Sequence, residues 1–374
     1  MAGIYYHIPF CKRICSYCDF YRTAALGRME EVVEAMCREV RTRADYLGGA
    51  PIRTRYFGGG TPSLCTPEQL VRLLDTTSEL MDCSAVEETT LEANPDDLNE
   101  HYLKALRSIG IDRLSIGVQS FDDGCLRLMN RRHTADEAEA AVKRAQDAGF
   151  ENLTIDLIFG VPNYGGSSLE RSIDRALALN VQHISAYLLT VEPRTRFGVM
   201  RDRGELQEVS DAVCEEEFAL IHNRLTKAGM EHYELSNFAR KGFRARHNSH
   251  YWDATPYLGI GPAAHSFDGR TRQWNTASVE RYLAGEAPEG EELTTTDRIN
   301  EYLMTRLRTI EGFAWNDLEA RFGADVCRQI ASDVARETAA GELVERDGRV
   351  SIPPQRMLVS DRIIASLFVE DRFA

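Results

Sequence analysis

Three cysteines lie close together near the start of the chain, in the pattern Cys11-x-x-x-Cys15-x-x-Cys18. Their thiolates are soft ligands, and three of them on one short loop can each hold one iron of a four-iron, four-sulfur (4Fe-4S) cluster. The fourth iron then has no protein ligand and stays open to a small molecule. The spacing therefore indicates a cluster that takes part in chemistry as well as in electron transfer.

A zinc site with His7 or Asp19 as fourth ligand is the alternative for this loop. Structural zinc sites usually combine one close pair of ligands with a second pair further along the chain. The sequence offers no such second pair, which favours iron and sulfur. The remaining six cysteines are scattered, and we expect buried thiols at Cys37, Cys65, Cys83, Cys125, Cys214 and Cys327.

Short β-rich runs alternate with amphipathic runs through the first half of the chain. The expected strands are Ile4–Ile8, Ile52–Phe57, Glu87–Glu92, Arg113–Gly117, Leu153–Phe159 and His183–Leu189. The expected helices include Met29–Tyr46, Thr66–Met81, Ala135–Ala148 and Ser168–Leu179. Such alternation implies parallel strands joined by right-handed crossovers. Because six units are too few for an eight-fold barrel, the pattern predicts an α/β fold, either a partial (β/α)6 barrel or an open doubly wound sheet.

Residues that suit ligand binding stand at the ends of these expected strands, which meet at one end of such a sheet. The run Gly58-Gly59-Gly60-Thr61-Pro62 exposes its backbone to a ligand because glycine has no Cβ. Asp156 is a carboxyl group in an apolar strand, where burial is costly unless the group is paired. Glu92 and Gln119 end two further strands. Arg131 has a guanidinium group that can donate two parallel hydrogen bonds to a carboxylate. Each is ordinary alone, but together they indicate one binding site.

These features resemble the radical-SAM superfamily, and the resemblance covers nearly the whole chain. In that family S-adenosylmethionine (SAM) binds the open iron and is cleaved to a 5′-deoxyadenosyl radical. The resemblance implies that the glycine loop binds the methionine amino group of SAM. It also implies that Glu92 binds the ribose and that Arg131 binds the methionine carboxylate. The implied cofactor-binding residues are Tyr5, Tyr17, Gly59, Gly60, Thr61, Glu92, Gln119, Arg131 and Asp156, beside the cluster ligands Cys11, Cys15 and Cys18.

Within the superfamily the chain is similar to the oxygen-independent coproporphyrinogen III oxidase-like family. The residues that carry this similarity are Tyr5–Cys18, Gly58–Pro62, Gly117–Phe121 and Asp156–Pro162. Two departures separate the chain from the oxidase itself. Phe20 stands where the oxidase has a fourth cysteine, and only ten residues precede Cys11 where the oxidase has a long extension.

The segment Arg246-His247-Asn248-Ser249-His250-Tyr251-Trp252 matches the His-Asn-x-x-Tyr-Trp pattern of a heme-chaperone branch of that family. A neutral imidazole is a good axial ligand for heme iron, and tyrosine and tryptophan can cover a porphyrin face. We therefore expect heme at His247, with His250 and His265 as rival ligands. The alternative is structural, with His247 and Asn248 holding a turn and Trp252 filling core.

We expect three parts in the chain: a barrel with the iron-sulfur and SAM sites (1–235), a connecting segment with the His-Asn-x-x-Tyr-Trp motif (236–292) and a small winged-helix-like domain (293–374). Ala284–Glu292 has the composition of a linker. In the last part, Asp297 is expected to cap a helix. The expected elements there are Arg298–Thr309, Trp315–Phe322, Asp325–Ala340, Ser360–Leu367 and a hairpin of Leu343–Glu345 with Arg349–Ile352.

The composition of the chain argues against nucleic-acid-binding and membrane-spanning classes of protein. A net charge of −14 argues against nucleic acid as a partner, and no apolar run is long enough to cross a membrane. The absence of a signal peptide and the cysteine usage favour the cytoplasm.

We expect a heme-trafficking protein that binds a 4Fe-4S cluster, SAM and heme and delivers heme to an acceptor protein. The alternatives are the oxidase, another radical enzyme that opens or methylates heme, and a zinc-stabilised interaction protein. The sequence leaves open whether SAM is cleaved.

Overall fold

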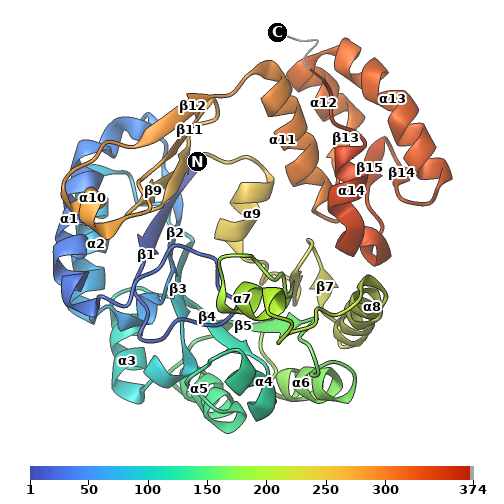
Figure 1. Ribbon diagram of the computed structural model, residues 1–374. Coiled ribbons are helices and arrows are strands. Elements are labelled where there is room, and N and C mark those ends of the chain that lie inside the picture. The colour runs from blue at the N-terminus through green and yellow to red at the C-terminus, as the bar shows by residue number, and fades with distance from the viewer. Residues whose placement is uncertain (371–374) are drawn as a thin grey trace.

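Six parallel strands, each followed by helical structure, form the centre of the computed structural model, which describes residues 1–370 (Figure 1). The strands are β1 (Ala2–Ile8), β2 (Ile52–Gly59), β3 (Glu88–Ala93), β4 (Arg113–Gln119), β5 (Asn152–Phe159) and β6 (His183–Leu188). The helices between them are α1 (Met29–Thr42), α2 (Pro67–Leu80), α3 (Glu100–Ser108), α4 (Asp123–Leu128), α5 (Ala135–Asp147) and α6 (Ser167–Ala178). Figure 1 shows these helices on the outer side of a curved sheet.

Short strands extend the sheet at both edges. β9 (Tyr257–Ile260) runs parallel to β1, and β10 (His265–Phe267), β11 (Thr271–Trp274) and β12 (Glu289–Glu292) follow it in antiparallel order. At the other edge, β8 (Asn237–Ala239) pairs with β6, and β7 (Glu231–His232) pairs with β8. In the described residues β12 and β7 are thus the opposite ends of a mixed twelve-stranded sheet. The predicted α/β fold with an open barrel is confirmed, and the edge strands are additions that the periodicity did not predict.

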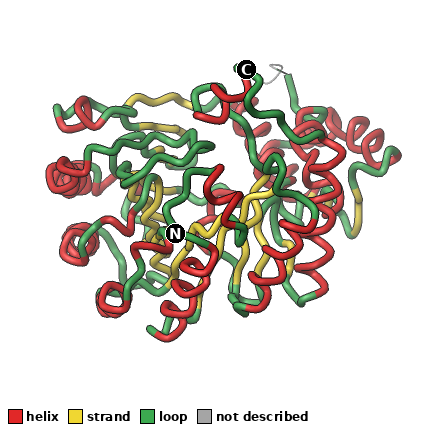
Figure 2. The backbone as a smooth tube through the Cα atoms, turned by 60° about the horizontal axis from the view of Figure 1, so that its bottom comes forward, coloured by secondary structure: helices red, strands yellow, loops and turns green. Residues whose placement is uncertain are grey.

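Local signals explain why the outer helices form where they do. Thr66 and Gln69 make a reciprocal capping box at the start of α2, and Thr134 and Glu137 make another at the start of α5. The predicted helix Met29–Tyr46 ends earlier, at Thr42, and a 3-10 turn follows it. Figure 2 shows the strands enclosed by helices. Among the described residues, every helix is too short or too polar to span a bilayer.

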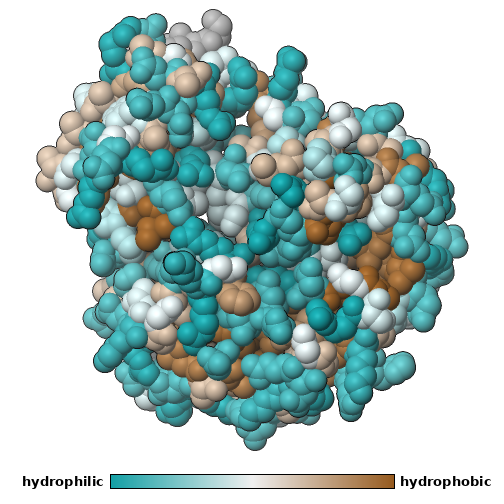
Figure 3. All heavy atoms as spheres, turned by 180° about the vertical axis from the view of Figure 1, so that it is seen from behind, coloured by the Kyte–Doolittle hydropathy of each residue, from teal (hydrophilic) through white to brown (hydrophobic). Residues whose placement is uncertain are grey.

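Three further helices pack around the sheet. α7 (Arg196–Asp202) and α8 (Asp211–Lys227) follow β6, and α10 (Val279–Leu283) packs against α1. The space-filling view from behind shows a largely hydrophilic surface with smaller hydrophobic areas (Figure 3). The buried apolar side chains form one core that lies between the sheet and its helices and continues into the C-terminal residues.

A short helix, α9 (Arg246–Trp252), carries the His-Asn-x-x-Tyr-Trp motif and contacts β2. Its first turn is held by a buried carboxylate, because Glu88 accepts hydrogen bonds from the backbone N–H groups of Arg246 (3.1 Å) and His247 (3.0 Å). Arg113, which is 1% exposed, lies 3.9 Å from Glu88 and donates to Asn152 (2.6 Å). A buried ion pair thus anchors the motif to the sheet.

The C-terminal elements form a unit of helices with a three-stranded sheet in the order β13-β15-β14. They are α11 (Thr295–Leu307), β13 (Phe313–Ala314), α12 (Trp315–Phe322), α13 (Ala324–Ala339), β14 (Val344–Arg346), β15 (Arg349–Ser351) and α14 (Ser360–Ala365). Two predictions are wrong in detail. Thr294 caps α11, with Asp297 as its capping-box partner. The predicted linker Ala284–Glu292 contains β12, because its last four residues pair with β11.

Candidate cluster and cofactor site

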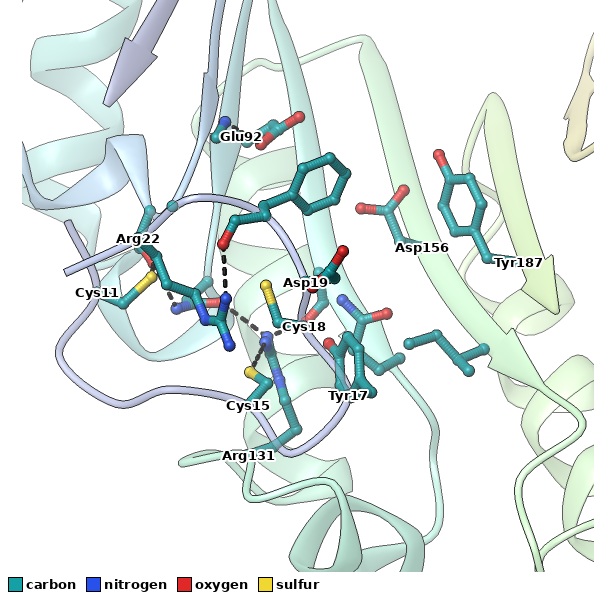
Figure 4. A pocket seen from close by; sticks show the side chains of 18 of the residues that line it. Cys11, Cys15, Tyr17, Cys18, Asp19, Arg22, Glu92, Arg131, Asp156 and Tyr187 are labelled. Carbon is teal, nitrogen blue, oxygen red and sulfur yellow. Dashed lines mark hydrogen bonds between the residues drawn. The ribbon is translucent and has the colours of Figure 1, made fainter. Parts of the chain in front are cut away.

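A cavity of about 540 Å³ opens at the C-terminal ends of the parallel strands. Figure 4 shows side chains from the cysteine loop, β3, β5 and β6 converging on it. All predicted site residues line this cavity except Tyr5 and His247. Those that line it are Cys11, Cys15, Tyr17, Cys18, Gly59, Gly60, Thr61, Glu92, Gln119, Arg131 and Asp156.

The cysteine loop is held in place through its backbone. Cys11 N–H donates to the carbonyl of Thr23 (2.9 Å), which fixes the start of the loop. In the middle, Ser16 N–H donates to the carbonyl of Met129 (3.0 Å), and its own carbonyl accepts from Phe197 N–H (2.9 Å). Because these partners lie on separate segments, they fix the loop against the rest of the fold.

Two of the thiols have donors directed at their sulfur atoms. Thr61 Oγ1 donates to Cys11 Sγ (3.4 Å), and Arg131 Nη1 donates to Cys15 Sγ (3.3 Å). Burial raises the pKa of Cys11 and Cys18, while the Arg22 guanidinium acts in the opposite direction on both. Donors and cations of this kind stabilise thiolates that bind metal.

The three thiols share one cavity without surrounding a single point. Within residues 1–370, no three His, Cys, Asp or Glu side chains are close enough together to hold one ion. In a 4Fe-4S cluster each thiolate binds a different iron, whereas a tetrahedral zinc site needs its ligands around one ion.

His7, one of the two candidate zinc ligands, does not line the cavity. Its Nδ1 is 3.1 Å from the Tyr5 hydroxyl and its Nε2 is 3.2 Å from the Tyr21 carbonyl, so both ring nitrogens have partners. The ring packs against Gly59, whose φ is +106° and where a Cβ would lie 2.6 Å from His7 Cε1. Glycine is therefore required at this turn. Asp19, the other candidate, does line the cavity.

Glu92 lies at the end of β3 with both carboxylate oxygens engaged. The Tyr56 hydroxyl donates to Oε1 (2.7 Å), and the Gly59 N–H donates to Oε2 (3.1 Å). Burial raises the pKa of Glu92 to about 7, and the nearby charge of Asp156 adds to this effect, while the two hydrogen bonds oppose it. The carboxyl group is thus poised between its charged and neutral forms near neutral pH.

Asp156 and Arg131 lie on the other side of the cavity. Burial raises the pKa of Asp156 to about 6, although hydrogen bonds from Ser185 and Ser115 oppose this rise. Arg131 Nη2 donates to Asn94 Oδ1 (2.7 Å) and to the Gly117 carbonyl (2.6 Å). Its buried Nε has no acceptor among the described residues. The guanidinium is therefore held firmly by Asn94 and Gly117.

Gln119 has a positive φ of 69°, at a point where the register between β4 and β5 is irregular. A residue with a side chain in this region is strained, and such strain is often found at binding sites. Gln119 lines the cavity in this conformation. The strain thus falls at a position that the sequence already marked as a site residue.

Tyr5 and His247 form a stacked group beneath the cavity. The Tyr56 ring lies 6.0 Å from that of Tyr5 and 4.9 Å from that of His247. His247 is 1% exposed, with Nδ1 2.9 Å from Thr54 Oγ1 and Nε2 3.0 Å from the Tyr251 hydroxyl. Burial lowers the pKa of His247 to about 3. Its imidazole is therefore neutral, and both nitrogens are engaged within the protein.

Sequence reasoning missed residues that position the predicted ones. Tyr56 holds Glu92, and Asn94 holds Arg131. Alternation along β2 places Tyr56 on the same face as Gly58, which was a usable signal. Arg22 and Tyr187 also line the cavity, from a loop and from β6, and no motif marked them.

Comparison with known proteins places this chain in a family. Residues 5–176 match the Radical SAM superfamily, and residues 293–359 match the HemN C-terminal domain. A Bacillus subtilis protein named heme chaperone HemW is 32% identical over 99% of this chain and 100% of its own length. A Lactococcus lactis protein of the same name is 37% identical over 82% of this chain and 78% of its own.

A solved structure has the same fold. Coproporphyrinogen III oxidase (HemN) from Escherichia coli, described as a radical SAM enzyme, superposes with a TM-score of 0.85. The match covers 98% of this chain and 90% of that chain, at 23% identity. At this identity the likeness concerns the fold.

Proposed function

The chain belongs to the family of heme chaperone HemW within the radical SAM superfamily, and we propose that it binds heme and delivers it to an acceptor protein. Membership of the superfamily implies a 4Fe-4S cluster and SAM. The observation that supports a cluster beside SAM is the single cavity that joins three cysteine thiols to the strand-end residues of β2–β5.

In this proposal different residues of the cavity bind the cluster and the parts of SAM. Cys11, Cys15 and Cys18 hold the cluster, Arg131 pairs with the methionine carboxylate, and Glu92 accepts hydrogen bonds from the ribose. The three cysteines are positioned by their loop, and Arg131 is positioned by its hydrogen bond to Asn94. When bound, cluster and SAM together supply one-electron chemistry.

The heme function rests on the family and on the motif at α9. Residues 1–235 serve the cluster and SAM, residues 236–292 present the His-Asn-x-x-Tyr-Trp motif, and the C-terminal unit begins at residue 293; the last four residues of the expected range 293–374 lie outside the described part of the chain. Heme bound near the motif would lie where α9 contacts both the sheet and α11. All nine cysteines are free thiols, which supports a reducing compartment such as the cytoplasm.

Coproporphyrinogen III oxidation is the second candidate function, because the whole fold resembles that enzyme. Phe20 argues against it, since this side chain is 69% exposed at the cavity where the oxidase has a cysteine. The curated relatives described above carry the chaperone name instead.

One anaerobic preparation tests the proposal. The chain is reconstituted with iron and sulfide, SAM binding is measured by calorimetry, and heme is titrated in the same sample while 5′-deoxyadenosine is assayed. We expect a 4Fe-4S chromophore, SAM binding and one heme per chain with a Soret band. Stoichiometric zinc in place of iron, or no heme binding, would contradict it.

A further inference from the structure

A second cavity, of about 370 Å³, lies where α9 meets the strands β9–β11 and the helices α11 and α12. It shares no lining residue with the cluster cavity. The cavity joins the connecting segment to the C-terminal unit, so it exists only when both are present. Nothing in the radical-SAM chemistry of the first cavity uses it.

The lining of this cavity combines flat apolar rings with positive charge. Trp252, Tyr257 and Phe322 contribute aromatic surface, and Arg298 and Arg321 contribute guanidinium groups. A third lining arginine, Arg272, is paired with Glu301 (2.9 Å). The cavity is therefore positive in a chain whose net charge is −14. Rings and arginines together suit a flat, anionic ligand with an apolar face.

Trp252 and Arg298 both have N–H donors without an acceptor among the described residues. The Trp252 indole N–H is buried and has no acceptor among the described residues. Arg298 donates only a long hydrogen bond (3.3 Å) to Thr295 of its own helix, and its side chain is exposed. Buried donors without acceptors are rare, so a bound ligand oxygen is a reasonable partner for the indole.

A histidine lines the same cavity with one ring nitrogen available. His250 is half-buried, and its Nδ1 lies 3.3 Å from Thr54 Oγ1, whereas no described residue bonds its Nε2. Thr54 is also the partner of His247 Nδ1, at 2.9 Å. If Thr54 donates to His247, then His250 Nδ1–H donates to Thr54, which leaves a lone pair on Nε2. An imidazole oriented in this way is suited to ligating a metal.

We propose that heme, the cargo of the proposed function on which this inference rests, binds in the cavity between α9 and α11–α12 with His250 Nε2 as its iron ligand. Arg298 and Arg321 pair with the propionates, and the aromatic rings cover the macrocycle. His247 then has a positioning role: it orients His250 through Thr54 and stacks on Tyr56, which holds Glu92. The motif thereby connects the heme cavity with the cofactor cavity.

The test is a titration of the cluster-loaded full chain with ferric heme, in wild type and four variants. His250→Ala should weaken binding by about tenfold or more and remove the spectrum of histidine-ligated heme, and added imidazole should restore that spectrum. His265→Ala is the matched control, because His265 is exposed on β10 and does not line the cavity.

A second pair of variants tests whether the arginines of the cavity pair with the heme propionates. Arg298→Ala should weaken heme binding by about tenfold but leave heme dimethyl ester unaffected, because the ester lacks the carboxylates. The control Arg328→Ala removes an exposed arginine of α13 that pairs with Asp325. Wild-type affinity and spectrum in both His250→Ala and Arg298→Ala would overturn this site while leaving heme binding intact. Failure of the wild type to bind heme would instead overturn the proposed function, and this site with it.

Discussion

Replacing Glu92 by glutamine tests how the cavity recognises SAM. The substitution keeps the size of the side chain and removes its charge, so the contacts with Tyr56 and Gly59 change little in shape. If Glu92 accepts hydrogen bonds from the ribose, the loss of a charged acceptor should cost about 1.5–3 kcal/mol of binding, which is roughly 10- to 150-fold in affinity.

The pKa of Glu92 makes a second expectation possible. Its ordinary value of 4.5 rises to about 7 in the folded protein. The free energy of unfolding therefore falls as pH rises from about 4.5 to about 7 and changes little above pH 7, where the full cost is about 3 kcal/mol. Glu92→Gln removes that cost. One mismatched hydrogen bond in the variant lowers its free energy of unfolding by about 1–3 kcal/mol, which offsets part of the gain. The melting temperature of the ligand-free variant at pH 8 should be equal to or above that of wild type.

Binding should follow the ionisation of the same group. Wild-type affinity for SAM should rise by about tenfold between pH 6 and pH 8, as Glu92 becomes charged. The variant should lose most of this dependence and keep only the part due to Asp156, whose pKa is about 6. Anaerobic calorimetry and thermal melts measure both effects, with Glu100→Gln on the exposed face of α3 as control. Wild-type affinity with an unchanged pH profile in Glu92→Gln would refute the assignment.

Three further predictions follow from the same structure. Cys15→Ser should abolish the brown 4Fe-4S chromophore while Cys83→Ser retains normal iron, because only the first thiol lines the cavity; equal iron loss in both would contradict this. Arg113→Ala should lower the free energy of unfolding by about 3–5 kcal/mol in denaturant melts, since it leaves Glu88 buried without its cation, whereas Arg53→Ala at a half-exposed pair should change little. Gly59→Ala should lower both stability and SAM affinity, because its φ of +106° and the His7 ring leave no room for a Cβ; the control Gly27→Ala, with nothing within 4 Å, should behave as wild type.

That most of the predicted site residues line one cavity could be inferred from the sequence, because these residues stand at strand ends. Parallel strands bring their C-terminal ends together, so Gly59, Glu92, Gln119 and Asp156 meet once the strands are assigned. The cysteine loop needed no fold to be recognised, because its spacing alone carries the chemistry. The strand alternation and the helical periodicity were strong over these elements.

What the sequence did not predict depends on short elements and on partners far apart in the chain. β7 to β12 are two to four residues long, too short for periodicity to register. Tyr56 was part of a predicted strand, but its bond to Glu92 depends on the register between β2 and β3. The burial of His247 depends on Thr54 and Tyr56, almost 200 residues earlier in the chain, and no local pattern reveals such contacts.

The most direct test of the central claim is to offer coproporphyrinogen III to the cluster-loaded wild-type chain with SAM and reductant, and to titrate heme into the same preparation. We expect one heme per chain with a Soret band and a porphyrinogen that stays unconverted. Sustained conversion of coproporphyrinogen III to protoporphyrinogen IX would contradict the chaperone function, whatever heme the chain also bound.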